Sequence, residues 1–133
     1  MTNRELKSKV MSLGNRLAVR MERRDAFVKA WEIMKAGSLE LVVKGVTFGS
    51  RQEALRRLSR YSPEQIRAFI VPEPENKTDR KAVRVMVGVQ NGRGLYCMGY
   101  LPKEYAQAAA NLKTIGLRVL DGDIRGARLA LAV

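Results

Sequence analysis

The hydrophobic residues change their spacing near Gly37, and this change limits how the chain can fold. Before it they recur every three or four residues from Leu6 onward, which is the spacing of an amphipathic helix. After it they alternate with polar residues, as in residues 83–87, which is typical of strands that bury one face. We therefore expect an N-terminal helical extension over residues 1–37 and a mainly β domain over residues 38–133.

The second part of the chain contains several short strand patterns. Glycine and proline separate the apolar runs, and the Asn91-Gly92 dipeptide strongly favours a hairpin turn. The connections are mostly short, which favours antiparallel pairing. The expected strands cover residues 39–49, 65–71, 81–89 and 94–101, and residues 116–133 form two further strands or one bent strand.

Two helices are expected between these strands. Ser50 and Glu53 have the spacing of a capping box, which would open a helix at Arg51. Pro102 suits the first turn of a second helix, and Gly116 would end it. The predicted fold class is α+β and mainly β. We expect a small antiparallel barrel, OB-like or SH3-like, of about six strands with two inserted helices and a preceding helical segment.

The chain is strongly basic, with 25 lysines and arginines against 13 aspartates and glutamates and a formal net charge of +12. Such an excess indicates a polyanionic partner, nucleic acid first and an anionic membrane second. A basic protein without such a partner is the alternative. No apolar stretch approaches the ~20 residues that span a bilayer, and the N-terminus lacks a signal peptide. We therefore expect a cytoplasmic protein with no membrane partner.

The absence of histidine excludes several kinds of active site. Serine–histidine–aspartate triads, cysteine–histidine zinc sites and histidine acid–base catalysis all need this residue. The single cysteine, Cys97, cannot form an internal disulfide and lies in an apolar run, so we expect a buried core thiol. An enzyme would then depend on carboxylates and a metal ion. We expect a non-catalytic protein without a metal or a cofactor.

Three motifs follow one another in the β domain. They are K-G-V-T-F-x-x-R-Q-E-A-L in residues 44–55, E-P-E-N-x-x-D-x-x-A-V-x-V in residues 73–85 and M-G-Y-L-P-K-E in residues 98–104. In this order and spacing they resemble the HIRAN domain, and the resemblance covers about residues 39–133. HIRAN domains look like modified oligonucleotide-binding barrels. They occur fused to Swi/Snf-type DNA translocases and in short stand-alone proteins of bacteria and phages.

The resemblance implies a module for single-stranded DNA or DNA 3′ ends, acting in DNA repair or replication or in a phage or mobile element. Asp79 would accept a hydrogen bond from the 3′-hydroxyl, since a carboxylate is a strong acceptor. Lys103 would contact a phosphate at the start of a helix. Phe48 and Tyr100 would stack on unpaired bases. The complete set that we predict to bind nucleic acid is Phe48, Arg51, Arg56, Asp79, Arg84, Tyr100 and Lys103.

Two positions depart from the pattern of the DNA-end binders in this family. Thr47 stands where an arginine precedes the stacking aromatic, and Thr78 stands where a second aromatic precedes the motif aspartate. The chain therefore lacks one guanidinium and one stacking ring at these positions. We expect weaker end recognition as a result.

The same residues also have structural interpretations. Asp79 and Asn76 suit a hydrogen-bonded turn, whereas Phe48 and Tyr100 suit the core. The remaining acids of the loop, Glu73 among them, are expected to be solvated or to cap backbone groups. These alternatives stay open on the sequence alone.

Two other functions fit the sequence. Phe27, Trp31 and Met34 share one helix face in the N-terminal extension. If that face does not pack on the β domain, the protein could be an adaptor that docks a helicase or a nuclease. The second alternative is RNA binding, which the net charge supports equally and which a site that reads the 2′-hydroxyl would reveal.

Overall fold

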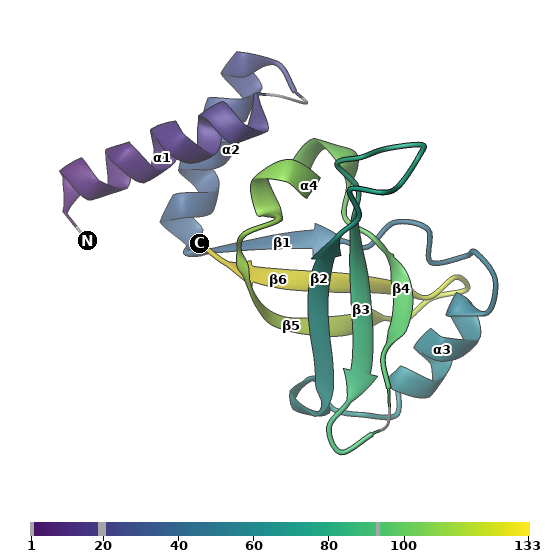
Figure 1. Cartoon of the computed structure of the whole chain (residues 1–133). Coiled ribbons are helices and arrows are strands. Elements are labelled where there is room, and N and C mark those ends of the chain that lie inside the picture. Colours follow the sequence, from purple (N-terminus) through teal and green to yellow (C-terminus); the bar gives the residue numbers. More distant parts are fainter. Residues whose placement is uncertain (1, 19–20, 93) are drawn as a thin grey trace.

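A computed structural model describes residues 2–18, 21–92 and 94–133 of the chain. Over these residues the fold is α+β, with helices and antiparallel strands in the order shown in Figure 1. The elements are α1 (Asn3–Leu17), α2 (Arg23–Ala36), β1 (Ser38–Val42), α3 (Arg51–Leu58), the 3-10 turn η1 (Pro63–Gln65), β2 (Ile66–Pro72), β3 (Val83–Val89), β4 (Tyr96–Tyr100), α4 (Lys103–Ala109), β5 (Lys113–Leu120) and β6 (Gly126–Ala132).

The described strands form two antiparallel sheets of three strands each, in the orders β1-β6-β5 and β2-β3-β4. Their side chains alternate between core and surface, so that Val83, Val85 and Val87 on β3 are buried while Leu129 and Leu131 on β6 fill the facing layer. The predicted α+β class and antiparallel pairing are therefore confirmed.

Backbone hydrogen bonds between Lys44, just after β1, and Tyr100, at the end of β4, link the two sheets. Lys44 N–H donates to the Tyr100 carbonyl at 2.8 Å, and Tyr100 N–H donates to the Lys44 carbonyl at 2.9 Å. Gly99 lies beside this contact, where a β-carbon would overlap the Lys44 carbonyl oxygen. The regular ladders of the described residues stay within the two separate sheets. The small OB-like or SH3-like barrel expected from the sequence therefore stays a prediction.

The N-terminal segment forms two helices that pack against each other. The Thr2 hydroxyl accepts a hydrogen bond from the Glu5 N–H at 3.1 Å and begins α1 with a capping box. Gly14 allows the Phe27 ring of α2 to lie directly against the α1 backbone, because a β-carbon at Gly14 would overlap that ring. Leu17 of α1 is fully buried and belongs to the same apolar cluster as the sheet residues.

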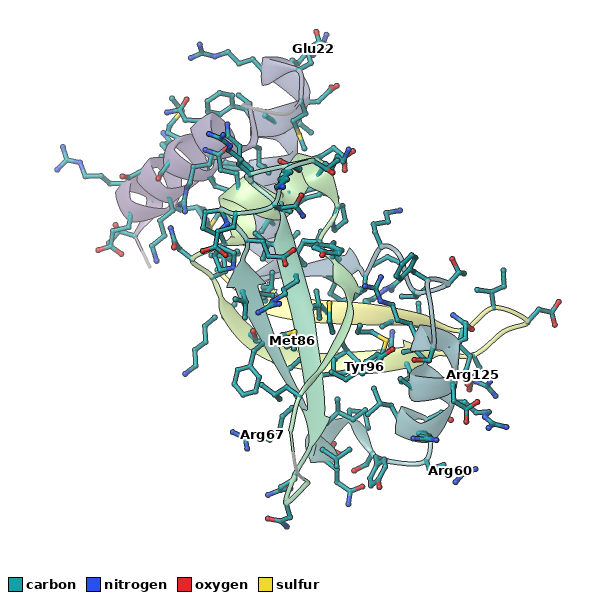
Figure 2. The ribbon with its side chains drawn as sticks, turned by 45° about the vertical axis from the view of Figure 1, so that its right-hand side comes forward. Glu22, Arg60, Arg67, Met86, Tyr96 and Arg125 are labelled. Atoms are coloured by element: carbon teal, nitrogen blue, oxygen red, sulfur yellow. The ribbon has the colours of Figure 1, made fainter. Side chains whose placement is uncertain are left out.

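Both N-terminal helices lie at the opposite end of the molecule from α3. Figure 1 shows α1 and α2 beyond α4, and Figure 2 places Glu22, at the start of α2, far from Arg60 just after α3. The helical character of this segment is as expected. Its separation from residues 38–133 as an independent domain stays a prediction. None of the described helices has the length and apolar character needed to cross a membrane.

The predicted capping box at Ser50 is wrong. Its side chain makes no cap hydrogen bond to α3 and instead shares a hydrogen bond of 2.9 Å with the Tyr96 hydroxyl of β4. Glu53 does not reach back to the helix start, because it pairs with Arg56 and with Arg57. The spacing suits a cap, but the Ser50 hydroxyl bonds to Tyr96 and the Glu53 carboxylate pairs with two arginines, so neither side chain caps the helix.

Two predicted boundaries also differ from the structure. The first strand ends at Val42 and not near Gly49, because the chain turns after Lys44 at Gly45, which has a left-handed φ of 79°. The last helix, α4, ends at Ala109, and Gly116 lies within β5. The turn predicted at Asn91-Gly92 does join β3 to β4, and Asn91 has the left-handed φ of 65° that such turns use.

The Gly99→Ala substitution is expected to destabilise the protein by about 2 kcal/mol, since the new methyl group has to displace the Lys44 carbonyl at the sheet junction. Urea unfolding measures the change. Gly116→Ala is the matched control, because a β-carbon there meets no atom within 4 Å. Equal stability of the Gly99 variant and the wild type would contradict the close approach of the two sheets.

Candidate nucleic-acid interface

A pocket lies where the two sheets meet, between the loop of residues 73–82, the end of β4 and the start of α4. Its volume is about 390 Å³. Three of the residues predicted to bind nucleic acid, Asp79, Tyr100 and Lys103, line it together. The other lining residues are Lys44, Gly45, Asn76, Thr78, Ala82, Leu101, Pro102, Glu104 and Ala106. We call this cavity the end pocket.

Side-chain hydrogen bonds to the backbone shape the loop that carries Asp79. The Asn76 side-chain oxygen accepts from the N–H groups of Thr78 and Asp79 at 2.9 and 3.0 Å. One carboxylate oxygen of Asp79 accepts from the Lys81 N–H at 2.9 Å. Both residues therefore form the turn that the structural interpretation predicted. The same hydrogen bonds hold the Asp79 carboxylate at the pocket wall, and its role toward a 3′-hydroxyl stays a prediction.

Tyr100 stands between a carboxylate and a guanidinium. Hydrogen bonding toward the Glu73 carboxylate, together with burial and the Glu73 charge, favours the protonated hydroxyl and raises the pKa of Tyr100 above its ordinary value of 10.0. Glu73 also faces Arg84, with 3.8 Å between the carboxylate and the guanidinium. Only 23% of the Glu73 side chain is exposed, so the expectation of a solvated or capping group at this position is wrong.

Arg51 stands beside the end pocket with aromatic rings on two sides. Its guanidinium carbon lies 5.1 Å from the centre of the Phe48 ring and 6.0 Å from the centre of the Tyr100 ring. It also donates to the Gly45 carbonyl at 2.8 Å. Phe48 is 73% exposed, so its interpretation as a core residue is wrong. An exposed ring beside a cation is a platform on which an unpaired base could stack.

The remaining predicted site residues lie in different surroundings. Lys103 is exposed at the first position of α4. Arg84 lies opposite Tyr100 in the β3–β4 pairing and faces Glu73, so it supports the end pocket from outside its lining. Arg56 lies on α3 and pairs with Glu53, away from the end pocket. The structure thus brings together five of the seven residues directly and places Arg84 behind them.

Two residues of the site were missed by sequence reasoning. Lys44 lines the end pocket, and the signal that could have found it is its place at the start of the first motif. Glu73 likewise stands at the start of the second motif, but its contact with Tyr100 depends on how the loop folds back on β4. Cys97, expected in the core, is half-buried, with its sulfur 3.9 Å from an Arg51 nitrogen.

Residues 2–18, 21–92 and 94–133 contain no cluster of potential ligands that could hold a metal ion.

Replacing Glu73 by Gln is expected to lower the pKa of Tyr100, because the phenolate would no longer form beside a carboxylate. Phenolate absorbance followed through a pH titration measures this, and Tyr100→Phe identifies the signal. The folded-state pKa is the higher one, so the interaction stabilises the protein fully below pH ~10 and is lost as pH rises through the folded value. An unchanged titration curve in the Glu73 variant would contradict the contact.

Comparison with known proteins gives one family for this chain. The model of the HIRAN domain matches residues 37–123, which include all three sequence motifs and every lining residue of the end pocket. No matching curated protein and no matching solved structure was found. The match begins at Gly37, where the hydrophobic spacing changes, and leaves α1 and α2 outside it. The chain therefore belongs to the HIRAN domain family, whose members are in general DNA-binding modules.

Proposed function

We propose that the protein is a non-catalytic module that binds single-stranded DNA and holds a free 3′ end in the end pocket. Asp79 accepts a hydrogen bond from the terminal hydroxyl, Lys103 and Lys44 face the phosphates, and Phe48 and Tyr100 offer their rings to the last bases. The observation that carries the proposal is that Asp79, Tyr100 and Lys103, which come from a loop, a strand and a helix, line one pocket.

The chemistry of the end pocket suits a DNA terminus. A 3′ end combines a hydroxyl donor, phosphate charges and exposed base faces, and the pocket combines two carboxylate acceptors, two lysines and a tyrosine. The net charge of +12 would favour the approach of any polyanion and would make binding sensitive to salt. The absence of histidine from the chain supports a role without catalysis.

Arg51 offsets part of the departure at Thr47. The family pattern has an arginine immediately before the stacking aromatic, and this chain has threonine there. Arg51 comes from the first turn of α3 and brings a guanidinium close to the Phe48 ring. Nothing comparable replaces the aromatic ring that is absent at Thr78. We therefore expect end recognition with fewer stacked bases.

The Asp79→Asn substitution tests end recognition. Asparagine retains a side-chain oxygen that can accept from Lys81 N–H, but it removes the carboxylate charge. We expect the wild type to bind a free 3′ end more tightly than a blocked one. In the variant the ratio of these two affinities should fall by about tenfold, which is the effect expected from losing a charge-assisted hydrogen bond. Fluorescence anisotropy with 5′-labelled oligonucleotides measures both affinities.

Asp121→Asn is the matched control, because it removes the same charge from an exposed position in the β5–β6 connection. It should leave the preference unchanged. A wild-type protein that binds free and blocked ends equally would exclude end recognition, and one that binds neither at low salt would exclude DNA binding.

Competition with RNA of the same sequence tests the RNA alternative, since a site that reads the 2′-hydroxyl distinguishes RNA from DNA.

The Lys103→Gln substitution is expected to weaken binding of free and blocked oligonucleotides alike and to reduce the slope of log affinity against log salt by about one. The reason is that a lysine on a phosphate releases one counterion and reads no end group. Lys113→Gln, an exposed lysine at the start of β5, serves as the control. A loss of free-end preference in the Lys103 variant would instead assign this lysine to the terminus itself.

The adaptor alternative has weaker support from the N-terminal helices. Phe27 packs against Gly14, and Lys35 covers the Trp31 ring at 5.0 Å, so both aromatic side chains have contacts within the chain. A shallow apolar hollow lined by Val10, Phe27, Val28, Trp31 and Glu32 remains on this surface. Docking of a helicase or a nuclease there stays a hypothesis, and it does not compete for the end pocket.

A further inference from the structure

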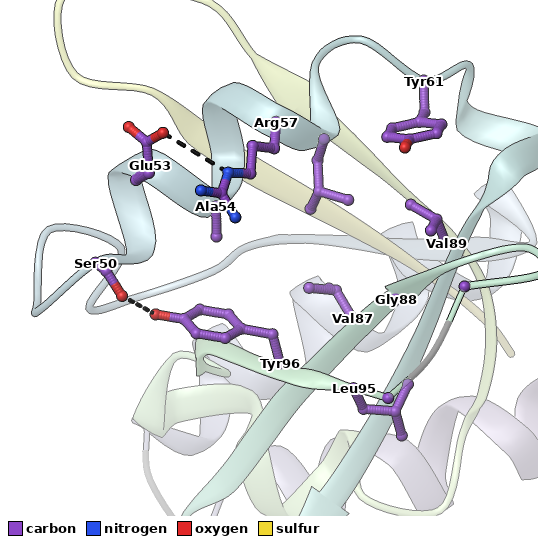
Figure 3. A pocket seen from close by; sticks show the side chains of 13 residues that line it. Ser50, Glu53, Ala54, Arg57, Tyr61, Val87, Gly88, Val89, Leu95 and Tyr96 are labelled. Carbon is purple, nitrogen blue, oxygen red and sulfur yellow. Dashed lines mark hydrogen bonds and ion pairs between the residues drawn. The ribbon is translucent and has the colours of Figure 1, made fainter.

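A second cavity, of about 550 Å³, lies between α3 and the strands β3 and β4, and we call it the α3 hollow. Figure 3 shows it from close by, with Arg57 and Glu53 contributed by α3, Tyr96 by β4 and Tyr61 by the segment after α3. Its remaining lining is mostly apolar or glycine. None of the residues predicted to bind nucleic acid lines this cavity.

Two tyrosines present partly exposed rings to the α3 hollow. Tyr61 is 43% exposed and Tyr96 is 39% exposed. The Tyr96 ring is fixed in place, because its hydroxyl shares a hydrogen bond with the Ser50 side chain at the start of α3 (Figure 3). Exposed aromatic rings beside an apolar cavity are unfavourable in water, and each offers a face on which a planar, partly apolar group can stack.

The helix α3, which forms one wall of the α3 hollow, is basic, and its Arg57 and Glu53 line the cavity. Residues 51–60 contain four arginines and one glutamate, and that glutamate, Glu53, is already paired with Arg56 and Arg57. The Arg57 side chain is nevertheless 74% exposed and can reach a ligand from the cavity edge. An exposed arginine on a basic helix beside an aromatic and apolar cavity matches a planar base attached to an anionic backbone better than it matches an apolar protein segment.

The α3 hollow and the end pocket lie at the two ends of the same strand. Tyr96 at the start of β4 lines the hollow, and Tyr100 at its end lines the end pocket. Four residue steps separate them, a path of roughly 13 Å along a strand. The adjacent residues Ser50 and Arg51 contact Tyr96 and Tyr100 respectively, so a single short segment borders both cavities.

We propose that the α3 hollow is a second base-binding subsite for the same DNA strand. A strand whose 3′ end lies in the end pocket passes Arg51 and places an upstream base against Tyr61 and Tyr96, while Arg57 contacts the neighbouring phosphate. This inference rests on the proposed function, because the hollow is reached by a strand that the end pocket already holds. If the subsite exists, affinity for DNA increases with oligonucleotide length, and this increase depends on the residues on and just after α3.

The test compares a trinucleotide with an oligothymidylate of about ten nucleotides, both labelled at the 5′ end. The variant Arg57→Gln/Tyr61→Ala changes only exposed side chains of the hollow. We expect it to lower affinity for the longer probe by about tenfold and to leave affinity for the trinucleotide within about twofold. The matched control is Arg67→Gln/Phe69→Ala on β2, an exposed arginine–aromatic pair with 5.5 Å between guanidinium and ring centre. It should leave both affinities unchanged.

A second variant, Ala54→Leu, fills the α3 hollow without changing any charge. It should produce the same length-selective loss, and thermal unfolding verifies that each variant folds. An equal loss of affinity for both probes, or no loss with the longer probe, overturns the subsite. The proposed function is still supported in that case if the wild-type protein binds the trinucleotide. Failure of the wild type to bind either probe overturns both proposals.

Discussion

The backbone contact between Lys44 and Tyr100 is the interaction on which the rest of the structure depends. It joins two sheets whose regular ladders are otherwise separate over the described residues, and it requires Gly99 beside it. The contact fixes where β4 ends relative to the turn that follows β1. Lys44 and Gly45 thereby become neighbours of Tyr100 in the lining of one pocket, although Tyr100 lies more than fifty positions further along the chain.

Polar side chains around this junction stabilise the loop and also line or border the end pocket. Asn76 and Asp79 satisfy backbone N–H groups in a loop that has no regular partner strand, and the same bonds hold the Asp79 carboxylate at the end pocket. Glu73 fixes the Tyr100 hydroxyl and faces Arg84. Residues that a sequence assigns either to a turn or to a site can thus serve both, because a rigid loop is what presents a carboxylate in one orientation.

The placement of the aromatic side chains, and not charge alone, explains why this surface is the interface we propose, since the N-terminal helices are also basic. The arginines of α3, Lys44 and Lys103 lie along the segments that border β4, and exposed Phe48, Tyr61 and Tyr96 lie among them. The aromatic side chains of α2 instead pack against α1 or under a lysine. Exposed aromatic rings close to basic side chains are what single-stranded nucleic acids need for stacking and phosphate contacts.

The sequence by itself determined the α+β class, the antiparallel strands, the change from helix to strand near Gly37 and the family, because hydrophobic spacing, glycine positions and motif order are local properties of the chain. Only the tertiary structure decided which side chains meet. Ser50 bonds to Tyr96 instead of capping α3, Phe48 is exposed beside Arg51, and Glu73 lies against Tyr100. The physical reason is that the partners of Ser50 and Glu73 lie far away in the sequence, and only the packing of the strands brings them within reach. The exposure of Phe48 likewise depends on where the turn after β1 places its ring.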